Sequence, residues 1–440
     1  MFSIKNWREG HKWTNWSESY LSHPSQFFAP QSIDEICEIV KQHALLKRTI
    51  RVTGAAHSFS PVAMPEQSAL TLHNLRGLIS VDKEAYTATF YAGTYLYEVG
   101  PLLAKYGLAL INMGDIQQQT LAGAISTGTH GTGITLGSFA AMVTRWGLVT
   151  GEGDYLEHER GDDVLSQALH ISVGMLGILV TVTIKVVPLY SLAFTSERHN
   201  FYGEIQQFQQ TIRQHRNIEW FYFPGSEKIQ VKKMEQVAPT EQSKLQKVVA
   251  QAKNQALENG LFYIASEICK VKPSFSMAIS KLSSNLVGGD TRTGMSYEIY
   301  PSPRSVKFVE TEYAIPVESF EACMEEVHAM FLRKEYDVHF PIECRTTAGE
   351  MGYLSPTQGK ESAFIAFHMY KGMNEAPYFK WVQTLMGKYH GRPHWGKVNY
   401  YNKENIEHFY PNANKFNEQR KQLDPYDVFH TTYFKRIFPS

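Results

Sequence analysis

At 440 residues the chain is long for a single hydrophobic core, so we expect two domains. Its 43 basic and 43 acidic residues give a formal net charge of zero, and neither nucleic acid nor a membrane surface is expected as a partner. Four scattered cysteines argue against a disulfide framework and a structural zinc site, which makes a reducing cytoplasm the expected compartment. The first 20 residues contain no apolar run, so we expect neither a secretory signal nor a membrane anchor there.

The first half of the chain alternates the strands and helices of a small α/β unit. Ser32 is placed to cap a helix that runs to about Leu46, and Glu35, three residues after the cap, is placed to complete a capping box. Further helices are expected at residues 95–106 and 162–169. Strands are expected at residues 48–53, 69–72, 78–81, 87–92, 108–113, 145–150 and 178–187.

The composition changes near residue 189, where glycines become fewer and longer amphipathic segments begin. We place a domain boundary there and divide the chain into segments 1–188, 189–390 and 391–440. Beyond the boundary we expect strands at 218–223, 308–315, 338–346 and 364–370, and helices at 240–259, 317–334 and 378–389. Residues 265–290 fit neither pattern, and residues 424–438 are expected to be an aromatic loop that packs back across the body.

Two stretches rich in small residues each follow a predicted strand. The first, residues 51–60, contains the single glycine Gly54 and presents His57; the second, residues 114–133, is a loop-like tract of Gly, Ser and Thr that presents His130. Small residues let backbone N–H groups approach a phosphate closely, although the three-glycine dinucleotide fingerprint is absent. Two such loops indicate a large, phosphate-bearing cofactor. In the alternative interpretation, both histidines are ordinary hydrogen-bonding residues.

An acid and a guanidinium alternate along the strand expected at 338–346. Because side chains alternate across a strand, Glu343 and Arg345 share one face and Cys344 lies on the other. One interpretation is a surface ion pair on an edge strand, which contributes little to stability. The apolar residues before the pair indicate partial burial instead, where the cost of desolvating two charges calls for a functional reason.

A stiff, turning segment at 394–397 carries His394 and Lys397. A glycine and Pro393 just before it exclude a regular helix, so the side chains are held by a rigid loop that is typical of a site. The main alternative is a solvated basic loop. A metal held by His390 and His394 is disfavoured, because Gly391 and Pro393 break the helix that would align the two histidines.

Together these motifs resemble one known family over nearly the whole chain. Their order is similar to that of the aldonolactone oxidoreductases, a branch of the vanillyl-alcohol-oxidase superfamily, and the strongest matches are Ala56-His57-Ser58, Gly128-Thr129-His130-Gly131-Thr132-Gly133 and His394-Trp395-Gly396-Lys397. The resemblance implies an α+β fold class. It consists of a two-lobed PCMH-type FAD-binding domain at 1–188, an α+β substrate (cap) domain with a large antiparallel sheet at 189–390, and a C-terminal segment at 391–440 that returns to the flavin.

The cofactor implied by the resemblance is FAD, with its pyrophosphate on the two loops and its 8α-methyl group bonded covalently to His57. Such a link makes the flavin a stronger oxidant, which suits the oxidation of an unactivated alcohol. No cysteine lies between Gly114 and Gly133, which excludes the second, cysteinyl link of berberine-bridge-like relatives. The implied FAD-binding residues are Thr53, Gly54, Ala55, Ala56, His57, Ser58, Gly114, Asp115, Thr120, Gly123, Ser126, Thr127, Gly128, His130, Gly131, Gly133, Ile178, Val180 and Lys397.

The reaction implied by the resemblance is hydride transfer from a secondary alcohol to flavin N5 together with removal of the hydroxyl proton. Glu343 would orient or deprotonate the hydroxyl, Arg345 would stabilise the alkoxide or bind the lactone oxygens, and Lys397 would stabilise negative charge on the reduced flavin. His394 would help to position the substrate. Gly114 has no side chain to shield the flavin, which implies an oxidase that reduces O2 to H2O2.

The implied substrate is a sugar-1,4-lactone of the L-gulono-, L-galactono- or D-arabinono- type. An alditol such as xylitol or sorbitol is the alternative, because both groups of enzymes share the same motifs. An alternative from another class is a non-catalytic, flavin-binding redox module, although such a protein has no need for Glu343, Arg345 and Lys397 together.

Overall fold

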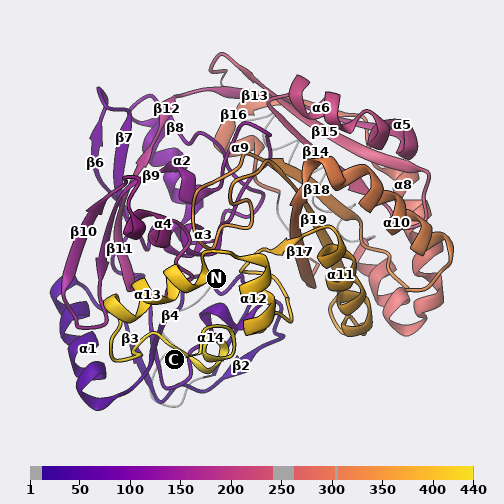
Figure 1. Ribbon diagram of the computed structural model, residues 1–440. Coiled ribbons are helices and arrows are strands. Elements are labelled where there is room, and N and C mark those ends of the chain that lie inside the picture. The colour runs from indigo at the N-terminus through magenta and orange to yellow at the C-terminus, as the bar shows by residue number, and fades with distance from the viewer. Residues whose placement is uncertain (1–11, 241–261, 303–305, 440) are drawn as a thin grey trace.

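The computed structural model describes residues 12–240, 262–302 and 306–439. A small parallel sheet and a five-stranded antiparallel sheet lie on one side of the molecule, and an eight-stranded sheet lies on the other (Figure 1). The helix expected at 240–259 lies outside the described residues except for its first residue.

The small sheet is parallel and follows the predicted β-α-β order. Strands β3 (Gln26–Phe28) and β4 (Ile50–Val52) both pair with β5 (Ser68–Leu70). Helix α1 (Ile33–Leu46) connects β3 to β4 and buries one apolar face against the core. This arrangement places the end of β4, and the loop that carries His57, at the edge of the sheet.

The start of α1 differs from the prediction in one detail. Ser32 is the N-cap, and its hydroxyl accepts a hydrogen bond from the Glu35 backbone N–H at 3.2 Å. The Glu35 carboxylate accepts from the backbone N–H of Gln31 at 2.7 Å, one residue before the cap. The cap is therefore confirmed, but the reciprocal bond of a capping box is displaced by one residue.

The second sheet is antiparallel, in the order β10-β9-β11-β7-β6, and at its centre β11 buries alternate side chains. Its strands are β6 (Leu78–Asp82), β7 (Thr87–Tyr91), β9 (Val143–Val149), β10 (Tyr155–Glu159) and β11 (Ile178–Lys185). Helices α2 (Leu96–Ala104) and α4 (Val164–His170) confirm the helices expected beside it. The strand expected at 108–113 is only β8 (Leu108–Ala109), which pairs with β12 (Val187–Pro188).

The tract expected to be a loop at 114–133 contains a helix, α3 (Leu121–Thr127). Thr120 caps it by accepting the backbone N–H of Gly123 at 3.2 Å, and Gly128 ends it in the left-handed region with φ of 74°. Leucine and isoleucine side chains of α3 pack into the core. Tertiary packing of this kind overrides the weak helix propensity of Gly, Ser and Thr, which is why the prediction was wrong here.

The large sheet has the order β16-β13-β15-β14-β18-β19-β17-β20, and all its pairs are antiparallel. Its strands are β13 (Ser191–Asn200), β14 (Asn217–Tyr222), β15 (Lys228–Val237), β16 (Asp290–Met295), β17 (Phe308–Pro316), β18 (Ile342–Thr347), β19 (Ser362–Tyr370) and β20 (Arg392–Pro393). Of these, β13, β15, β16 and β20 were not expected. The short pair β1 (Trp13–Thr14) and β2 (Leu21–Ser22) stands apart from it.

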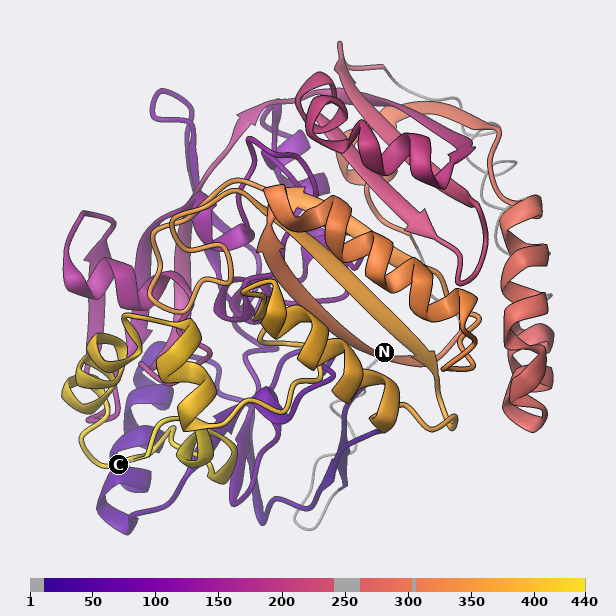
Figure 2. The ribbon, with the colours of Figure 1, turned by 45° about the vertical axis from the view of Figure 1, so that its right-hand side comes forward.

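Helices cover one face of the large sheet. Helix α10 (Phe320–Leu332) follows a 3-10 turn at Val317–Ser319, and with α11 (Ala376–Lys388) it lies over the strands and runs in nearly the same direction (Figure 2). The Cys344 thiol of β18 lies 3.9 Å from the Met324 sulfur of α10, so Cys344 faces the helices. Further helices of this half are α5 (Phe201–Gln206), α6 (Phe208–Gln214), α8 (Ser276–Leu286) and α9 (Ser296–Ile299), and residues 262–271 are helical as well.

The C-terminal segment packs back onto the first half of the chain and is largely helical. It contains α12 (Lys403–Phe409), α13 (Ala413–Leu423) and α14 (Thr432–Ile437), drawn in yellow in Figure 1. The backbone N–H of Ile50 in β4 donates to the Val428 carbonyl at 2.9 Å. The expected aromatic loop at 424–438 is therefore wrong in its second half, where α14 forms.

In the described part of the chain, none of the helices has the length and apolar character to cross a membrane.

Candidate functional site

A cavity opens where the loop after β4, the start of α3 and the turn before β11 meet. It contains about 940 Å³ of space, part of which is open to solvent. The predicted cofactor-binding residues that line it are Thr53, Gly54, Ala55, Ala56, His57, Ser58, Thr120, Gly123, Ser126, Thr127 and Ile178. Further lining residues that were not predicted include His73, Tyr95, Gln119, Gly174 and Gly177.

The loop at 53–58 is held from its outer side by the N-terminal segment. The Trp13 indole N–H donates to the Thr53 hydroxyl at 2.8 Å, and the Trp16 backbone N–H donates to the Ala56 carbonyl at 2.7 Å. Ala56 lies in the left-handed region with φ of 53°, a conformation that costs energy for a residue with a side chain. The surrounding contacts therefore impose a fixed shape on the loop that carries His57.

Small residues let the loop and α3 approach each other closely. A Cβ atom added to Gly54 would lie 2.7 Å from the Thr120 hydroxyl oxygen, so a larger residue would displace the side chain that caps α3. Behind the cavity, a Cβ atom on Gly177 would lie 2.7 Å from the Val149 carbonyl oxygen. A wall made of backbone and small side chains fits a cofactor whose phosphates bind backbone N–H groups.

His57 is a neutral imidazole at the end of this cavity. Burial lowers its pKa to about 4, with a further contribution from the Lys397 ammonium. Its ring stacks on Trp16, with centroids 5.8 Å apart and planes inclined by 24°. A neutral ring nitrogen retains its lone pair, so His57 can act as a nucleophile at physiological pH.

The other predicted cofactor-binding residues lie outside the lining of the cavity: Gly114, Asp115, Gly128, His130, Gly131, Gly133, Val180 and Lys397. Several of them join the loop after α3 to the large sheet. The Gly133 backbone N–H donates to the Thr346 carbonyl of β18 at 2.8 Å. A Cβ atom on Gly114 would lie 2.8 Å from the His130 carbonyl oxygen, so these two segments also pack through a glycine. The structure thus brings His130 against Glu312 of β17 and Phe364 of β19, away from the lining of the cavity.

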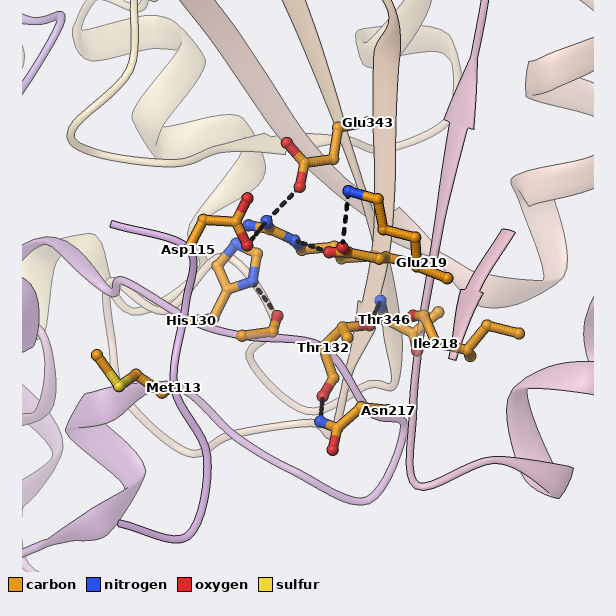
Figure 3. A network of polar contacts seen from close by, with 12 residues as sticks. Met113, Asp115, His130, Thr132, Asn217, Ile218, Glu219, Glu343 and Thr346 are labelled. Carbon is orange, nitrogen blue, oxygen red and sulfur yellow. Dashed lines mark hydrogen bonds and ion pairs between the residues drawn. The ribbon is translucent and has the colours of Figure 1, made fainter. Parts of the chain in front are cut away.

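Three carboxylates surround one guanidinium on the sheet face opposite the helices. Arg345 forms ion pairs with Glu343, with Glu219 of β14 (Nε to Oε2, 3.1 Å) and with Asp115 (Nη2 to Oδ1, 2.7 Å). Figure 3 shows the three carboxylates pointing toward one another from three different segments. Burial alone would lower the pKa of Arg345, but Asp115, Glu343 and Glu219 raise it well above its ordinary value. Lys232 reaches Glu219 from the other side at 3.6 Å.

This cluster decides between the two interpretations of the Glu343 and Arg345 pair. Strand β18 lies between β14 and β19 in the sheet, and Glu343 is 4% exposed. The pair is therefore a buried feature of a central strand, and the surface-pair alternative is wrong. Glu219 was not predicted, because its place beside Arg345 depends on the pairing of strands 126 residues apart in sequence.

The segment at 394–397 is fixed against both the first loop and strand β17. Trp395 is fully buried and its indole N–H donates to the Leu354 carbonyl at 2.7 Å. The Ser60 hydroxyl donates to the Trp395 carbonyl, and the Phe59 backbone N–H donates to the Gly396 carbonyl, both at 2.6 Å. The solvated-loop alternative is therefore wrong, and the segment joins the loop of His57.

A second charged cluster lies around Lys397. The ammonium is 2.6 Å from Glu310 Oε1 and 3.8 Å from Glu312 Oε2, and His130 Nε2 is 3.4 Å from Glu312 Oε1. Burial by itself would raise the pKa of Glu312, but Lys397 and His130 hold it well below its ordinary value. Burial lowers the pKa of His394 to about 3, so this histidine is neutral. Neither glutamate was predicted.

Two groups of described residues bring carboxylate and imidazole ligand atoms within 4.8 Å of one another, the spacing a metal would need: His130, Glu312 and His394, and Asp115, Glu219 and Glu343. In each group a cation of the protein already contacts the carboxylates, Lys397 in the first and Arg345 in the second. His394 also accepts a hydrogen bond at Nδ1 from the Gly396 backbone N–H at 3.0 Å. These contacts satisfy the carboxylates without an ion.

Buried neutral histidines make the stability of the apoprotein depend on pH. Burial lowers the pKa of His57 and His339 to about 4 and that of His394 to about 3, from an ordinary value of 6.5. Below pH 6.5 the unfolded chain therefore binds protons that the folded chain does not, and the free energy of unfolding falls as the pH drops from 6.5 towards 4. These groups cause no change above that range.

The expected loss is several kcal/mol between about pH 7 and about pH 4.5, because a tenfold difference in proton affinity corresponds to about 1.4 kcal/mol. Urea unfolding of the apoprotein at a series of pH values measures it. The His339→Gln variant should show a shallower dependence on pH, because one of the three groups is removed. Equal slopes for the two proteins would contradict the assignment to His339.

Comparison with known families matches both halves of the chain. Residues 182–437 match the family described as D-arabinono-1,4-lactone oxidase. Residues 24–158 match the family described as FAD binding domain. The second match includes the loop that carries His57 and the tract that contains α3, and the first includes β14, β17, β18 and the segment at 394–397.

Characterised relatives align with the chain over nearly its full length. The L-gulono-1,4-lactone dehydrogenase of Mycobacterium tuberculosis is 31% identical over 429 residues, which cover 97% of this chain and 98% of that protein. The L-gulonolactone oxidase of Mus musculus is 27% identical over 449 residues, covering 98% of this chain and 99% of that protein. One relative is named a dehydrogenase and the other an oxidase.

A solved structure shares the fold at low sequence identity. The crystal structure of cholesterol oxidase from B. sterolicum superposes with a TM-score of 0.81 and 15% identity, covering 97% of this chain and 96% of that chain. This likeness concerns the fold alone. With the FAD-binding match it confirms the predicted fold class, an α+β protein that pairs an FAD-binding part with a large antiparallel sheet.

Proposed function

The chain belongs to the D-arabinono-1,4-lactone oxidase family, and from that premise we propose that it is an FAD-dependent oxidase of a sugar-1,4-lactone. It would oxidise a secondary alcohol of the lactone and pass the electrons to O2, giving H2O2. L-gulono-, L-galactono- and D-arabinono-1,4-lactone are the candidate substrates. The small-molecule substrate and O2 would be its partners, with no nucleic acid or membrane, and the scattered free cysteines favour the cytoplasm as its compartment.

One observation carries this proposal: the residues proposed for the cofactor and for the substrate form a single electrostatic neighbourhood. The Lys397 ammonium contributes to the low pKa of His57. Glu312 lies beside Lys397 and also contributes to the raised pKa of Arg345. Groups from the loop after β4, from β17, from β18 and from the C-terminal segment therefore converge where a flavin and an alcohol would meet.

The residues of the cavity fit FAD. The glycines and small side chains in its lining would hold the pyrophosphate. In this proposal residues 1–188 form the cofactor domain, residues 189–390 form the substrate domain, and residues 391–440 form the segment that returns to the flavin. When bound, FAD would accept a hydride at N5. His57 would form the covalent bond to the 8α position, supported by its neutral ring and its place in the lining of the cavity.

The protein's own groups would then prepare the substrate. Glu343 would bind the reacting hydroxyl and take its proton, and Arg345, held as a cation by its three carboxylates, would bind the oxygen on which negative charge develops. Lys397 would supply positive charge to the reduced flavin. His394 is neutral and buried, so it would position the substrate or the loop and would not donate charge.

Gly114 leads to a prediction about oxygen. The Gly114→Ala variant should react more slowly with O2 while retaining turnover with an artificial electron acceptor, because the added methyl group would shield the flavin. The methyl group would also lie 2.8 Å from the His130 carbonyl oxygen, so the neighbouring segment must shift slightly. Stopped-flow reoxidation of the reduced enzyme in air-saturated buffer measures the effect.

The matched control is Gly387→Ala in α11, where an added Cβ would make only an ordinary contact at 3.8 Å. This variant should reoxidise like the unmodified enzyme. If the unmodified enzyme itself stays reduced for minutes in air, the protein is a dehydrogenase and the oxidase assignment is wrong.

A steady-state panel tests the substrate class. Peroxide release is measured with L-gulono-, L-galactono- and D-arabinono-1,4-lactone, xylitol and sorbitol. The proposal predicts the highest kcat/KM for a lactone. A higher value for xylitol or sorbitol would establish the alditol alternative on the same site.

A further inference from the structure

Two glutamates on one face of β17 hold the Lys397 ammonium. Glu310 and Glu312 are two residues apart, so both side chains point to the same side of the strand. They are 6% and 4% exposed, and their carboxylates lie 2.6 Å and 3.8 Å from Lys397 Nζ. Lys397 is thus a cation placed between two buried anions.

Each glutamate is backed by a buried histidine in the same way. His130 Nε2 lies 3.4 Å from Glu312 Oε1, while its Nδ1 is 2.8 Å from the Gly131 carbonyl oxygen. His368 Nε2 lies 3.7 Å from Glu310 Oε1, while its Nδ1 is 3.0 Å from the Pro341 carbonyl oxygen. A carbonyl only accepts, so Nδ1 carries a proton in both histidines and their Nε2 edges face the carboxylates. The two carbonyls thus hold the rings with their Nε2 atoms toward the carboxylates.

The backbone around Lys397 is bonded to the same strand. The backbone N–H of His394 donates to the Glu312 carbonyl at 3.0 Å, and that of Val398 donates to the Glu310 carbonyl at 2.9 Å. The Thr311 hydroxyl donates to the Val398 carbonyl at 2.7 Å. Strand β17 therefore fixes Lys397 twice, once through its main chain and once through the two carboxylates at the end of its side chain.

Stability does not explain this arrangement. Burying two carboxylates beside one ammonium costs desolvation energy that well-packed apolar residues would not. A role in placing charge does explain it, because a flexible lysine side chain delivers a defined field only when its ammonium is held. We propose that Glu310 and Glu312 are positioning residues that hold Lys397 against the flavin. The inference rests on the proposed function, in which Lys397 stabilises the reduced flavin.

Sulfite binding tests the proposal without turnover. Sulfite adds reversibly to N5 of an oxidised flavin through its sulfur lone pair, and the negative charge that results is stabilised by a nearby cation. Its dissociation constant is read from the loss of the visible flavin absorbance. The proteins compared are the unmodified holoenzyme, Glu310→Gln, Glu312→Gln, Lys397→Met and the double variant Glu312→Gln/Lys397→Met.

We expect Lys397→Met and Glu312→Gln each to weaken sulfite binding by about tenfold, within the range of coupling between contacting residues. Glu310→Gln should do the same and provides the test if Glu312→Gln does not fold. In the double variant, Glu312→Gln should add no further weakening, because it acts through Lys397. The kcat for the lactone should fall with KM little changed in the single variants.

The direction in which sulfite affinity changes in the glutamate variants separates a positioning role from a simple effect of their charge. Removal of a negative charge near the flavin would by itself strengthen sulfite binding, so stronger or unchanged binding in both glutamate variants would overturn the inference. Equal weakening by Glu312→Gln with and without Lys397 would also overturn it. If Lys397→Met leaves sulfite binding unchanged, the role of Lys397 in the proposed function fails, and the inference fails with it.

The matched control is Glu350→Gln. Glu350 is a buried glutamate that pairs with His170 Nε2 at 2.9 Å and contacts Ser138 and Ser355, with no ion pair to Lys397. This variant shows how far sulfite binding changes when a buried glutamate beside a histidine is neutralised away from Lys397. Sulfite binding in this variant should equal that of the unmodified enzyme, and a tenfold change would remove the specificity claimed for β17.

Discussion

Replacing Arg345 with alanine is expected to lower kcat by at least about 10²- to 10³-fold, the usual effect of removing one donor that stabilises a developing oxyanion. The guanidinium is the only cation in direct contact with both Asp115 and Glu343 among the described ion pairs. Its loss removes charge stabilisation of the alkoxide and leaves three carboxylates facing one another. Steady-state kinetics with the preferred lactone, alongside the flavin content of the purified variant, measure the effect.

Arg345→Lys is the control for charge. It keeps the positive charge but loses the planar fork that contacts Glu219 and Asp115 at once, so its kcat should lie between those of Arg345→Ala and the unmodified enzyme. Both variants should retain FAD, because Arg345 does not line the cofactor cavity. Activity close to that of the unmodified enzyme in a folded, yellow Arg345→Ala protein would remove Arg345 from the catalytic set.

Replacing His57 with alanine is expected to abolish covalent attachment of the flavin completely. The unmodified chain should keep its flavin fluorescence after acid precipitation and denaturing electrophoresis, because the bond survives unfolding. The His57→Ala chain should lose it, although the native variant can still bind FAD through the wall of the cavity. Turnover should also fall, because the non-covalent flavin is a weaker oxidant.

His73→Ala is the matched control, since His73 also lines the cavity but is not proposed to bond the flavin. Its denatured chain should fluoresce like the unmodified one. Fluorescence retained by the denatured His57→Ala chain would show that another residue forms the bond, and fluorescence absent from the unmodified chain would show that the FAD is not covalently bound.

Local patterns are sufficient to predict much of the fold. The period-two strand β7, the cap of α1 and the hairpin of β9 and β10 all follow from residues close together in sequence. Strands β13 and β15 cannot be predicted from neighbouring residues in this way. Their outer parts carry charged side chains that interrupt the apolar alternation. Those charges pair across the two strands, as in the 3.2 Å contact of Lys233 with Glu197, and this contact appears only once the register is known.

The candidate site also contains some features that local sequence predicts and others that depend on contacts between distant segments. Glu343 and Arg345 are predictable as a pair, since one strand places both on one face. The contacts of Arg345 with Glu219 and Asp115 are not, because they require β14 to lie beside β18 and the loop before α3 to reach the sheet. Sequence periodicity carries no information about which distant strand becomes a neighbour.

Glu310 and Glu312 carry a local signal in the sequence. Both interrupt a mainly apolar and aromatic strand, which is buried along nearly its whole length. Ionised residues in such a position require partners, and the only way to find Lys397, His130 and His368 as those partners is to fold the chain. An isolated acid in a predicted central strand is therefore a useful marker of a site.

In the proposed reaction, this chain couples oxidation of a sugar lactone to reduction of O2 through a flavin. The most direct measurement follows the visible flavin absorbance of the holoenzyme, mixed first with the lactone without oxygen and then with air. We predict that a lactone bleaches the absorbance, and that air restores it with release of one equivalent of H2O2 per flavin. Absorbance that persists with every lactone and polyol of the panel would contradict the account and indicate a flavin-binding module without this activity.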